Sequence, residues 1–238
     1  MSLEKPLILW HIMNFSASSG SLESLVTSGY GLSPTPFHYH LNGKQISSKT
    51  AQKDLGLLVS ADLTWRSHYQ LISSRAYKML GLLRRVFCSS VSVSAKRSLY
   101  ITLVRSQLLY CSSVWHPYLL KDIKCLEYVQ RRATKIITND HSLDYRNRLI
   151  HLNLLPLMME FEFADIMLLV KSIKFPSNHF NICDFVQFCS HSTRAAHGLK
   201  LKHSLCRNDF ERNFYFNRIP RLWNALPSFD ITLSLSAI

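Results

Sequence analysis

The stretch LEYVQRRATKII, residues 126–137, decides how the rest of the chain is interpreted. At about 100° per residue in a helix, five apolar side chains share one face: Leu126, Val129, Ala133, Ile136 and Ile137. Tyr128, Arg131 and Lys135 fall on the opposite face, with Arg132 near its edge. The pattern predicts an amphipathic helix. It leaves open whether the basic face is simply solvated or contacts a polyanion.

The positive charge of the chain is concentrated around this helix. The 238 residues include 28 Lys and Arg against 15 Asp and Glu, a net charge of +13. From Arg66 to His151 there are 15 basic and 4 acidic residues, a net charge of +11, so the remainder carries only +2. Such a block is typical of a protein that binds RNA, DNA or an acidic membrane surface, although a solvated basic face has the same composition.

The composition predicts a folded protein of a reducing compartment. Hydrophobic residues make up 47% of the chain, enough for a substantial core. The spacing of the six cysteines suggests no disulfide framework, so we expect free thiols and an intracellular location, either nuclear or cytoplasmic. No uncharged apolar run approaches about 18 residues and no signal peptide is recognisable, so we expect no transmembrane helix and no membrane partner.

The predicted fold class is mainly α, a helical bundle with a small N-terminal β-hairpin. The chain divides into four predicted segments: a poorly ordered arm (1–36), a hairpin and strand segment (37–66), a basic helical domain (67–174), and an irregular segment with a short C-terminal helix (175–238). Asn42-Gly43 is a strong hairpin signal, and the apolar run LGLLVS (55–60) is suited to a further strand.

Apolar periodicity predicts several helices in the basic domain. The first spans 67–88, with these side chains inward: Leu71, Ile72, Ala76, Met79, Leu80, Leu83 and Phe87. Ser94 is suited to cap a second helix that runs to about Val114. Its predicted inward residues are Leu99, Leu103 and Val104, and its predicted outward residues are Lys96, Arg97 and Arg105.

Three more helices are expected beyond the break at Pro117. The helix that contains the opening stretch has Asp122 near its start, where a negative charge suits the helix dipole, and ends near Asn139. A short helix is expected over 143–152. Pro156 then suits the first position of an apolar helix over 157–174.

Five sequence motifs occur in an order that resembles a known family. They are KDLGLLVSADLTWRSHY (53–69), AYKMLGLLRRVF (76–87), LYITLVRSQLLYCSSVWHPYLLKDIKCLEYVQRRATK (99–135), LNLLPLMMEFEFADI (152–166) and FNRIPRLWNALP (216–227). Together they resemble the C-terminal third of the reverse transcriptase polyprotein of non-LTR retrotransposons, of the jockey and CR1 kind. The resemblance covers roughly residues 37–228, and the first 36 residues match nothing in the pattern.

The resemblance implies a role in holding nucleic acid. In that family the hairpin and the following strand come just after the catalytic palm, and the helices correspond to the thumb and a downstream connection. The thumb holds the template–primer duplex, so the implied partner is RNA or an RNA–DNA duplex. No small-molecule substrate is evident from the sequence.

The residues that polymerase chemistry needs are missing from this sequence. Such chemistry uses a cluster of aspartates that holds two divalent metals about 4 Å apart. The family has an adjacent Asp-Asp pair after an aromatic and a small residue, and this chain has no Asp-Asp pair. Its nearest equivalent is FADI (Phe163–Ile166), in an apolar helical pattern. We therefore expect no catalytic residues, no metal, no cofactor and no enzyme activity from the chain as it stands.

The candidate nucleic-acid-binding residues belong to the first and third predicted helices. They are Arg75, Lys78, Arg84, Arg85, Tyr128, Arg131, Arg132 and Lys135. Arg and Lys can neutralise phosphates, and a tyrosine can stack on a base or a sugar. Each has a simpler interpretation: Arg84 and Arg85 also suit a helix C-terminus, and the others also suit a solvated surface.

Two further groups of residues are better explained by structure than by binding. Trp115 and Trp223 lie next to Leu, Val and Pro, and we expect both in the core. A cluster of Cys and His residues lies in the irregular segment: Cys183, Cys189, His191, His197, His203 and Cys206. Their spacing does not fit the paired ligands of a structural zinc site, so free thiols and surface histidines are expected.

The sequence thus predicts a truncated remnant of a retrotransposon reverse transcriptase that lacks the catalytic palm and retains a basic surface for RNA or an RNA–DNA duplex. Two alternatives remain open. The chain could be an inert relic with no selected function, or a thumb that acts in trans with a separate palm.

Overall fold

The computed structural model describes residues 40–41, 44–45, 50–62, 64–87, 90–140, 142–175, 182–189 and 200–226. It divides the chain into two compact units, residues 1–65 and 66–238. The arm predicted over 1–36 lies outside the described residues.

The described part of the first unit consists of two β-hairpins. Strands β1 (His40–Leu41) and β2 (Lys44–Gln45) pair antiparallel around Asn42-Gly43, as predicted. Strand β4 (Leu57–Ser60) lies in the run expected to form a strand, and it pairs with β3 (Ala51–Asp54), which the sequence analysis missed. The backbone turns between β3 and β4 at Leu55 and Gly56, both at positive φ, the geometry of a two-residue hairpin turn.

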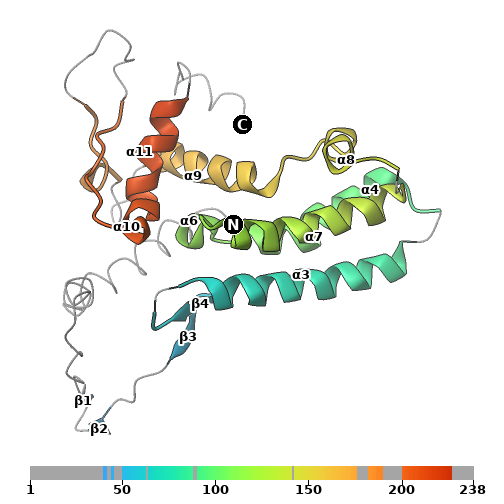
Figure 1. The fold of residues 1–238 in the computed structure, drawn as a ribbon, viewed down its shortest axis with the longest axis horizontal. Coiled ribbons are helices and arrows are strands. Elements are labelled where there is room, and N and C mark those ends of the chain that lie inside the picture. Colours follow the sequence, from blue (N-terminus) through green and yellow to red (C-terminus); the bar gives the residue numbers. More distant parts are fainter. Residues whose placement is uncertain are drawn as a thin grey trace. The chain divides into compact units, whose positions relative to one another are not determined.

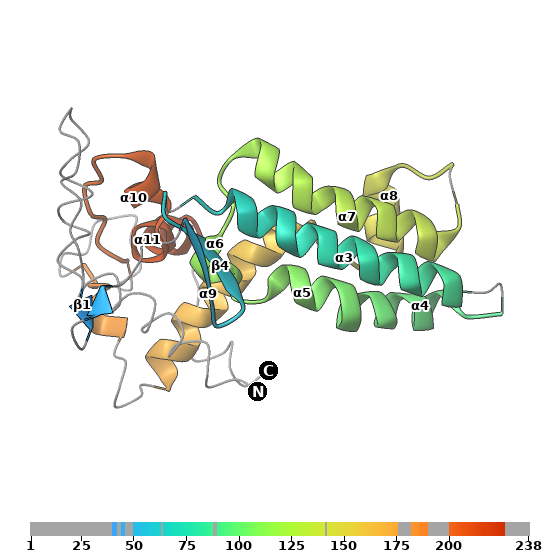
Figure 2. The same cartoon turned by 90° about the horizontal axis from the view of Figure 1, so that it is seen from below.

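The second unit is helical, so the prediction of a mainly α fold with a small N-terminal hairpin is confirmed (Figure 1). Its elements are α3 (Arg66–Val86), α4 (Val93–Leu99), the π-helix η1 (Tyr100–Arg105), α5 (Ser106–Leu109), α6 (Ser112–Trp115), α7 (Leu120–Thr138), α8 (Tyr145–His151), α9 (Leu157–Lys174), the 3₁₀ turn η2 (Ile182–Asp184), α10 (Asp209–Asn213) and α11 (Tyr215–Ala225). Helix α3, helix α7 and the α4–η1–α5 segment pack against one another (Figure 2), and α9 contacts α6, α7 and α11.

The core of this unit follows the apolar stripes that the sequence predicted. On α3, Ile72, Ala76, Leu80 and Leu83 are buried. On α7 the buried apolar residues are those expected, except that Ile136 is only half-buried. Both tryptophans expected in the core, Trp115 and Trp223, are buried there.

Trp115 lies at the centre of an aromatic cluster. Its ring centroid is 5.5 Å from that of Phe161 and 5.8 Å from that of Tyr69, both edge-on. The Tyr69 hydroxyl donates a hydrogen bond to the carbonyl oxygen of Trp115 at 2.8 Å. Such contacts add to the stability supplied by the buried apolar area, and they tie α3, α6 and α9 together.

The helix predicted over 94–114 is interrupted, which corrects two expectations. Ser92 caps it rather than Ser94, because the Ser92 Oγ accepts a hydrogen bond from the Ala95 N–H at 3.2 Å. The helix then passes through the π-helical turn η1 and breaks at Cys111, whose φ of 53° is left-handed.

The predicted faces of this segment are also partly wrong. Leu103 is exposed, whereas Lys96 and Arg105 are buried. Leu103 and Arg105 lie inside η1. A π-helical turn holds more residues than an α-helical turn, so their side chains are rotated away from the faces expected for an α-helix. Lys96 instead lies over the ring of Phe87, with its Nζ 5.8 Å from the ring centroid.

Three arginines of the basic block form hydrogen bonds that connect different segments of the fold. Arg97 and Arg105 donate hydrogen bonds to backbone carbonyls of the loop between α8 and α9. Arg105 also forms an ion pair with Glu160 at 2.7 Å. Arg148 is buried, and it donates to Thr134 Oγ1 and to the carbonyl of Leu143. The positive charge of Arg105 and Arg148 is therefore not available on the surface, and that of the half-buried Arg97 is available only in part.

The aspartate of the FADI stretch belongs to a buried polar cluster in α9. Asp165 Oδ2 accepts a hydrogen bond from Arg218 Nε at 2.9 Å and lies 3.0 Å from His116 Nδ1. Arg218 also donates to the carbonyl of Ser113, and Tyr215 donates to the carbonyl of Asp165. The cluster fastens α11 to α6 and α9.

The C-terminal part of the unit contains more helix than the sequence predicted. Helices α10 and α11 occupy the region expected to form one short helix, with Pro220 inside α11. Before them, Phe188 and Leu201 form an isolated bridge, and the Asn224 side chain bonds to both backbone groups of Leu201. Among the described residues, no helix has the length and apolar character needed to cross a membrane.

Candidate nucleic-acid interface

One face of α7 carries a basic stripe along most of the helix. Six exposed residues form it: Lys121, Lys124, Tyr128, Arg131, Arg132 and Lys135. They recur every three or four positions, so at about 100° per residue they share one face, and at 1.5 Å per residue the stripe is about 21 Å long. The helix presents this face because its other side carries the buried Leu126, Val129 and Ala133.

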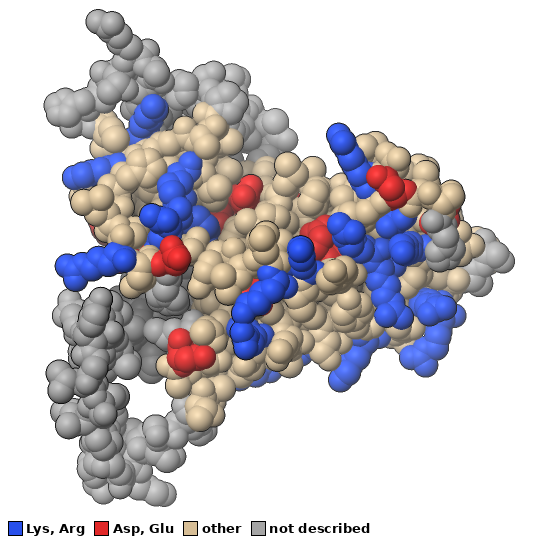
Figure 3. Space-filling model, viewed as in Figure 1, with Lys and Arg blue, Asp and Glu red and all other residues tan. Residues whose placement is uncertain are grey.

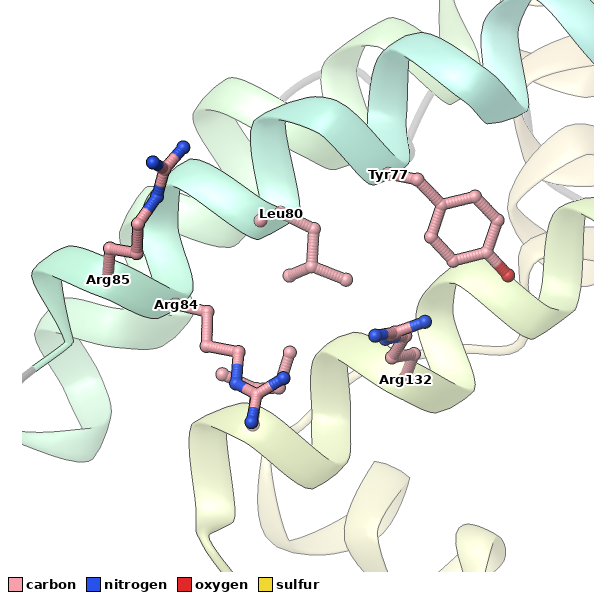
Figure 4. Close-up of a pocket in the computed structure, with 7 residues that line it drawn as sticks. Tyr77, Leu80, Arg84, Arg85 and Arg132 are labelled. Atoms are coloured by element: carbon pink, nitrogen blue, oxygen red, sulfur yellow. The ribbon is translucent and has the colours of Figure 1, made fainter.

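A groove of about 480 Å³ lies beside this stripe, between α3 and α7 (Figure 4). Seven residues line it: Tyr77, Leu80, Gly81, Arg84, Arg85, Arg132 and Ile136. Arg84 extends from α3 toward α7, and Arg132 extends from α7 toward α3, with Leu80 between them. Arg85 points away from α7. The groove therefore has basic edges and an apolar floor.

Tyr77 lines the groove and also lies near Arg132 of the stripe. The Arg132 guanidinium carbon lies 5.9 Å from the centroid of the Tyr77 ring. Burial raises the pKa of the Tyr77 hydroxyl, Cys125 and Tyr128 add to this effect, and Arg132 opposes it. Tyr77 of α3 therefore lies close to Arg132 of α7, so an aromatic ring accompanies the basic side chains.

The positive charge of this region has few nearby negative partners. Of the 15 basic residues from Arg66 to His151, eleven are exposed, whereas three of the four acidic residues are half-buried. No carboxylate in the described part of the chain pairs with Arg84, Arg85 or Arg132. In the space-filling view, blue side chains follow α7 toward α8 (Figure 3). The surface is therefore suited to a polyanion.

The predicted site residues are all exposed, but they do not form a single patch. Arg84, Arg85 and Arg132 line the groove, and Tyr128 and Lys135 belong to the stripe. Their role in binding stays a prediction.

Three of the predicted residues do not line the groove. Arg131 belongs to the stripe, but its guanidinium carbon lies 4.4 Å from the centroid of the Tyr145 ring on α8, so it is partly engaged within the protein. Arg75 is exposed, but it is two residues from Tyr77 and therefore lies on roughly the opposite side of α3 from the groove. Lys78 is exposed and does not line the groove.

The sequence analysis missed three residues of this surface. Lys121 and Lys124 continue the spacing of Tyr128, Arg131 and Lys135, so the same helical periodicity would have found them. Tyr77 is three and seven residues from Leu80 and Arg84, but only the pairing of α3 with α7 brings it near Arg132.

The cysteine and histidine cluster of the irregular segment is only partly described. Cys189 and His203 are exposed, and cysteines 111, 125, 189 and 206 form no disulfide within the described part of the chain. The side chains of Cys183, His191 and His197 lie outside the described residues. In the ranges that the structure describes, no three His, Cys, Asp or Glu side chains come close enough together to hold a metal ion.

Comparison with known proteins supports a retrotransposon origin for the chain. Over 100 residues it is 29% identical to the retrovirus-related Pol polyprotein from type-1 retrotransposable element R1 of Bradysia coprophila. The matched stretch covers 41% of this chain and 10% of that polyprotein. No family model matches the chain, and no solved structure matches it.

Proposed function

We propose that this chain derives from a non-LTR retrotransposon reverse transcriptase, from its thumb and connection region, and that it binds the phosphate backbone of RNA or of an RNA–DNA duplex. The basic stripe of α7 is the main contact surface, and the groove arginines extend it. The chain acts as a holder of nucleic acid and carries out no polymerisation by itself.

The observation that carries this proposal is the arrangement of charge on α7. Five Lys and Arg side chains share one exposed face with a tyrosine, over a length of about 21 Å. An exposed face that served only solubility would mix both signs of charge, whereas the stripe contains no Asp or Glu. Phosphates spaced along a strand are matched by cations spaced along a helix, and each neutralised phosphate releases bound counterions.

The proposal that the chain does not polymerise rests on its aspartates. The sequence has no adjacent pair, and Asp165 is fully buried in an ion pair with Arg218. A carboxylate so engaged is not free to bind a metal that must also contact a nucleotide. Primer extension with Mg²⁺ and nucleotides tests this point, and extension by the purified chain alone would contradict it.

The salt dependence of binding tests the proposed surface. The affinity of the full chain for a short RNA–DNA duplex should fall as salt rises, with a logarithmic slope of about −0.9 per neutralised phosphate. Replacing two stripe lysines, Lys124→Gln with Lys135→Gln, should flatten that slope by about two. Both side chains are exposed and have no partner in the described structure, so the fold should be unaffected.

A matched control removes the same charge elsewhere. Lys171→Gln with Lys174→Gln replaces two exposed lysines at the end of α9, outside the stripe and the groove. This pair should leave the slope unchanged. Equal slopes for both double variants would mean that net charge, rather than the α7 stripe, determines binding.

A further inference from the structure

The groove between α3 and α7 has an apolar part that binding to phosphates alone does not require. Its floor is apolar, formed by the buried Leu80 and the half-buried Ile136. Gly81 borders open space, because a Cβ at that position would meet no atom within 4 Å. A surface that contacted only phosphates would need no such hollow. The groove has room for an uncharged, planar group beside the guanidinium groups.

We infer that this groove holds one unpaired nucleotide of a bound nucleic-acid strand. Its base lies against Leu80 and the Tyr77 ring, and its phosphate contacts Arg84 and Arg132. The inference rests on the proposed function, since the same basic surface must first bring the strand to the protein. It goes further by assigning the groove to a single-stranded part of the ligand, distinct from the duplex that the α7 stripe contacts.

Charge complementarity selects a nucleotide over other occupants of the groove. Arg84 and Arg132 extend over the apolar floor, and no described carboxylate lines it. An apolar protein side chain in this position would leave these two guanidinium groups without an anion. A nucleotide satisfies both parts of the groove, because a base has an apolar face that stacks on aromatic rings and its phosphate pairs with arginine. Paired bases inside a duplex cannot enter the groove.

The substitution Gly81→Leu tests the inference by filling the groove without changing any charge. Leucine is a better helix former than glycine, so α3 should be retained, which far-UV circular dichroism checks. The affinity of the full chain for a short single-stranded RNA should fall about tenfold, the loss expected when one base no longer stacks. The affinity for a blunt RNA–DNA duplex should change less than twofold.

A second leucine provides the control. Gln70→Leu adds the same side chain at an exposed position of α3 that does not line the groove, and it should leave both affinities unchanged. If Gly81→Leu weakens single-strand binding no more than Gln70→Leu does, or weakens both ligands equally, the nucleotide site is wrong. Salt-dependent duplex binding by the unmodified chain would still support the proposed function in that case. Its absence would refute the proposed function without deciding the effect of Gly81→Leu.

Discussion

At the scale of single residues, His68 and His116 are buried histidines that favour the neutral form. Burial, with help from Arg75, lowers the pKa of His68 to about 4. Burial also lowers the pKa of His116, although the Asp165 carboxylate, 3.0 Å from its Nδ1, opposes this effect. In the unfolded chain a histidine titrates at about 6.5. Below that pH, the unfolded state therefore binds protons that the folded state does not.

This difference predicts that stability falls as the pH falls through 6.5 toward 4. For His68 alone, the free energy of unfolding should decrease by about 2 kcal/mol between pH 7.5 and pH 5. The pKa of Asp165 is lowered because Arg218 and His116 together outweigh its burial, so its stabilising effect is lost only below about pH 4 and lies outside this window. Urea unfolding at the two pH values measures the change.

A variant separates His68 from the other titrating groups. His68→Gln removes its titration, so the decrease in stability between pH 7.5 and pH 5 should shrink by about 2 kcal/mol. The absolute stability of the variant does not matter for this comparison. An identical pH dependence in the variant and the unmodified chain would show that His68 titrates with the same pKa in the folded and unfolded states.

At the scale of elements, the contact between α11 and α9 depends on the buried ion pair between Arg218 and Asp165. Arg218→Met would leave the Asp165 carboxylate buried with only His116 beside it. Removing one partner of a buried pair typically costs about 3–5 kcal/mol. Thermal or urea unfolding should therefore show a large loss of stability for this variant.

A double-mutant cycle distinguishes this pair from general loss of packing. The variant that combines Asp165→Asn with Arg218→Met should lose less stability than the sum of the two single variants, because neither substitution then leaves an unpaired charge. Effects that add within about 0.5 kcal/mol would show that the two residues do not stabilise each other.

The helices themselves could largely be predicted from the sequence, whereas their interruptions could not. Apolar residues every three or four positions determine α3, α7 and α9, because burial of one stripe is the main source of their stability. The π-helical turn η1 leaves no such pattern, so Leu103 was placed inside and Arg105 outside, the reverse of what the structure shows. Short strand β3, with four exposed residues, also gave no alternation to detect.

The candidate site could likewise be predicted from the sequence only in part. The exposed face of α7 follows from periodicity alone, and the predicted Tyr128, Arg131, Arg132 and Lys135 lie on it. The groove could not be predicted, because it depends on which faces of α3 and α7 meet. Stacking of Arg131 on Tyr145 likewise joins residues of two helices whose packing the sequence does not specify.

At the scale of the whole molecule, the two compact units predict that residues 66–238 can fold without the first 65. The aromatic cluster around Trp115 and the ion pairs of Asp165 and Arg105 lie entirely within this unit. The shortened chain should melt cooperatively, within a few degrees of the full chain, with its helical far-UV spectrum retained. A broad, non-cooperative melt of the full chain would instead favour an inert relic.

The arginines that hydrogen-bond to other parts of the fold affect how natural variation in this sequence should be interpreted. Arg97, Arg105 and Arg148 belong to the basic block, but their side chains form hydrogen bonds within the protein. A copy of the gene that had lost one of them should be less stable, whereas a copy without Lys124 or Lys135 should fold but bind nucleic acid less tightly, as the proposed function predicts. An analysis that counted substitutions at all basic positions together would not distinguish loss of stability from loss of binding.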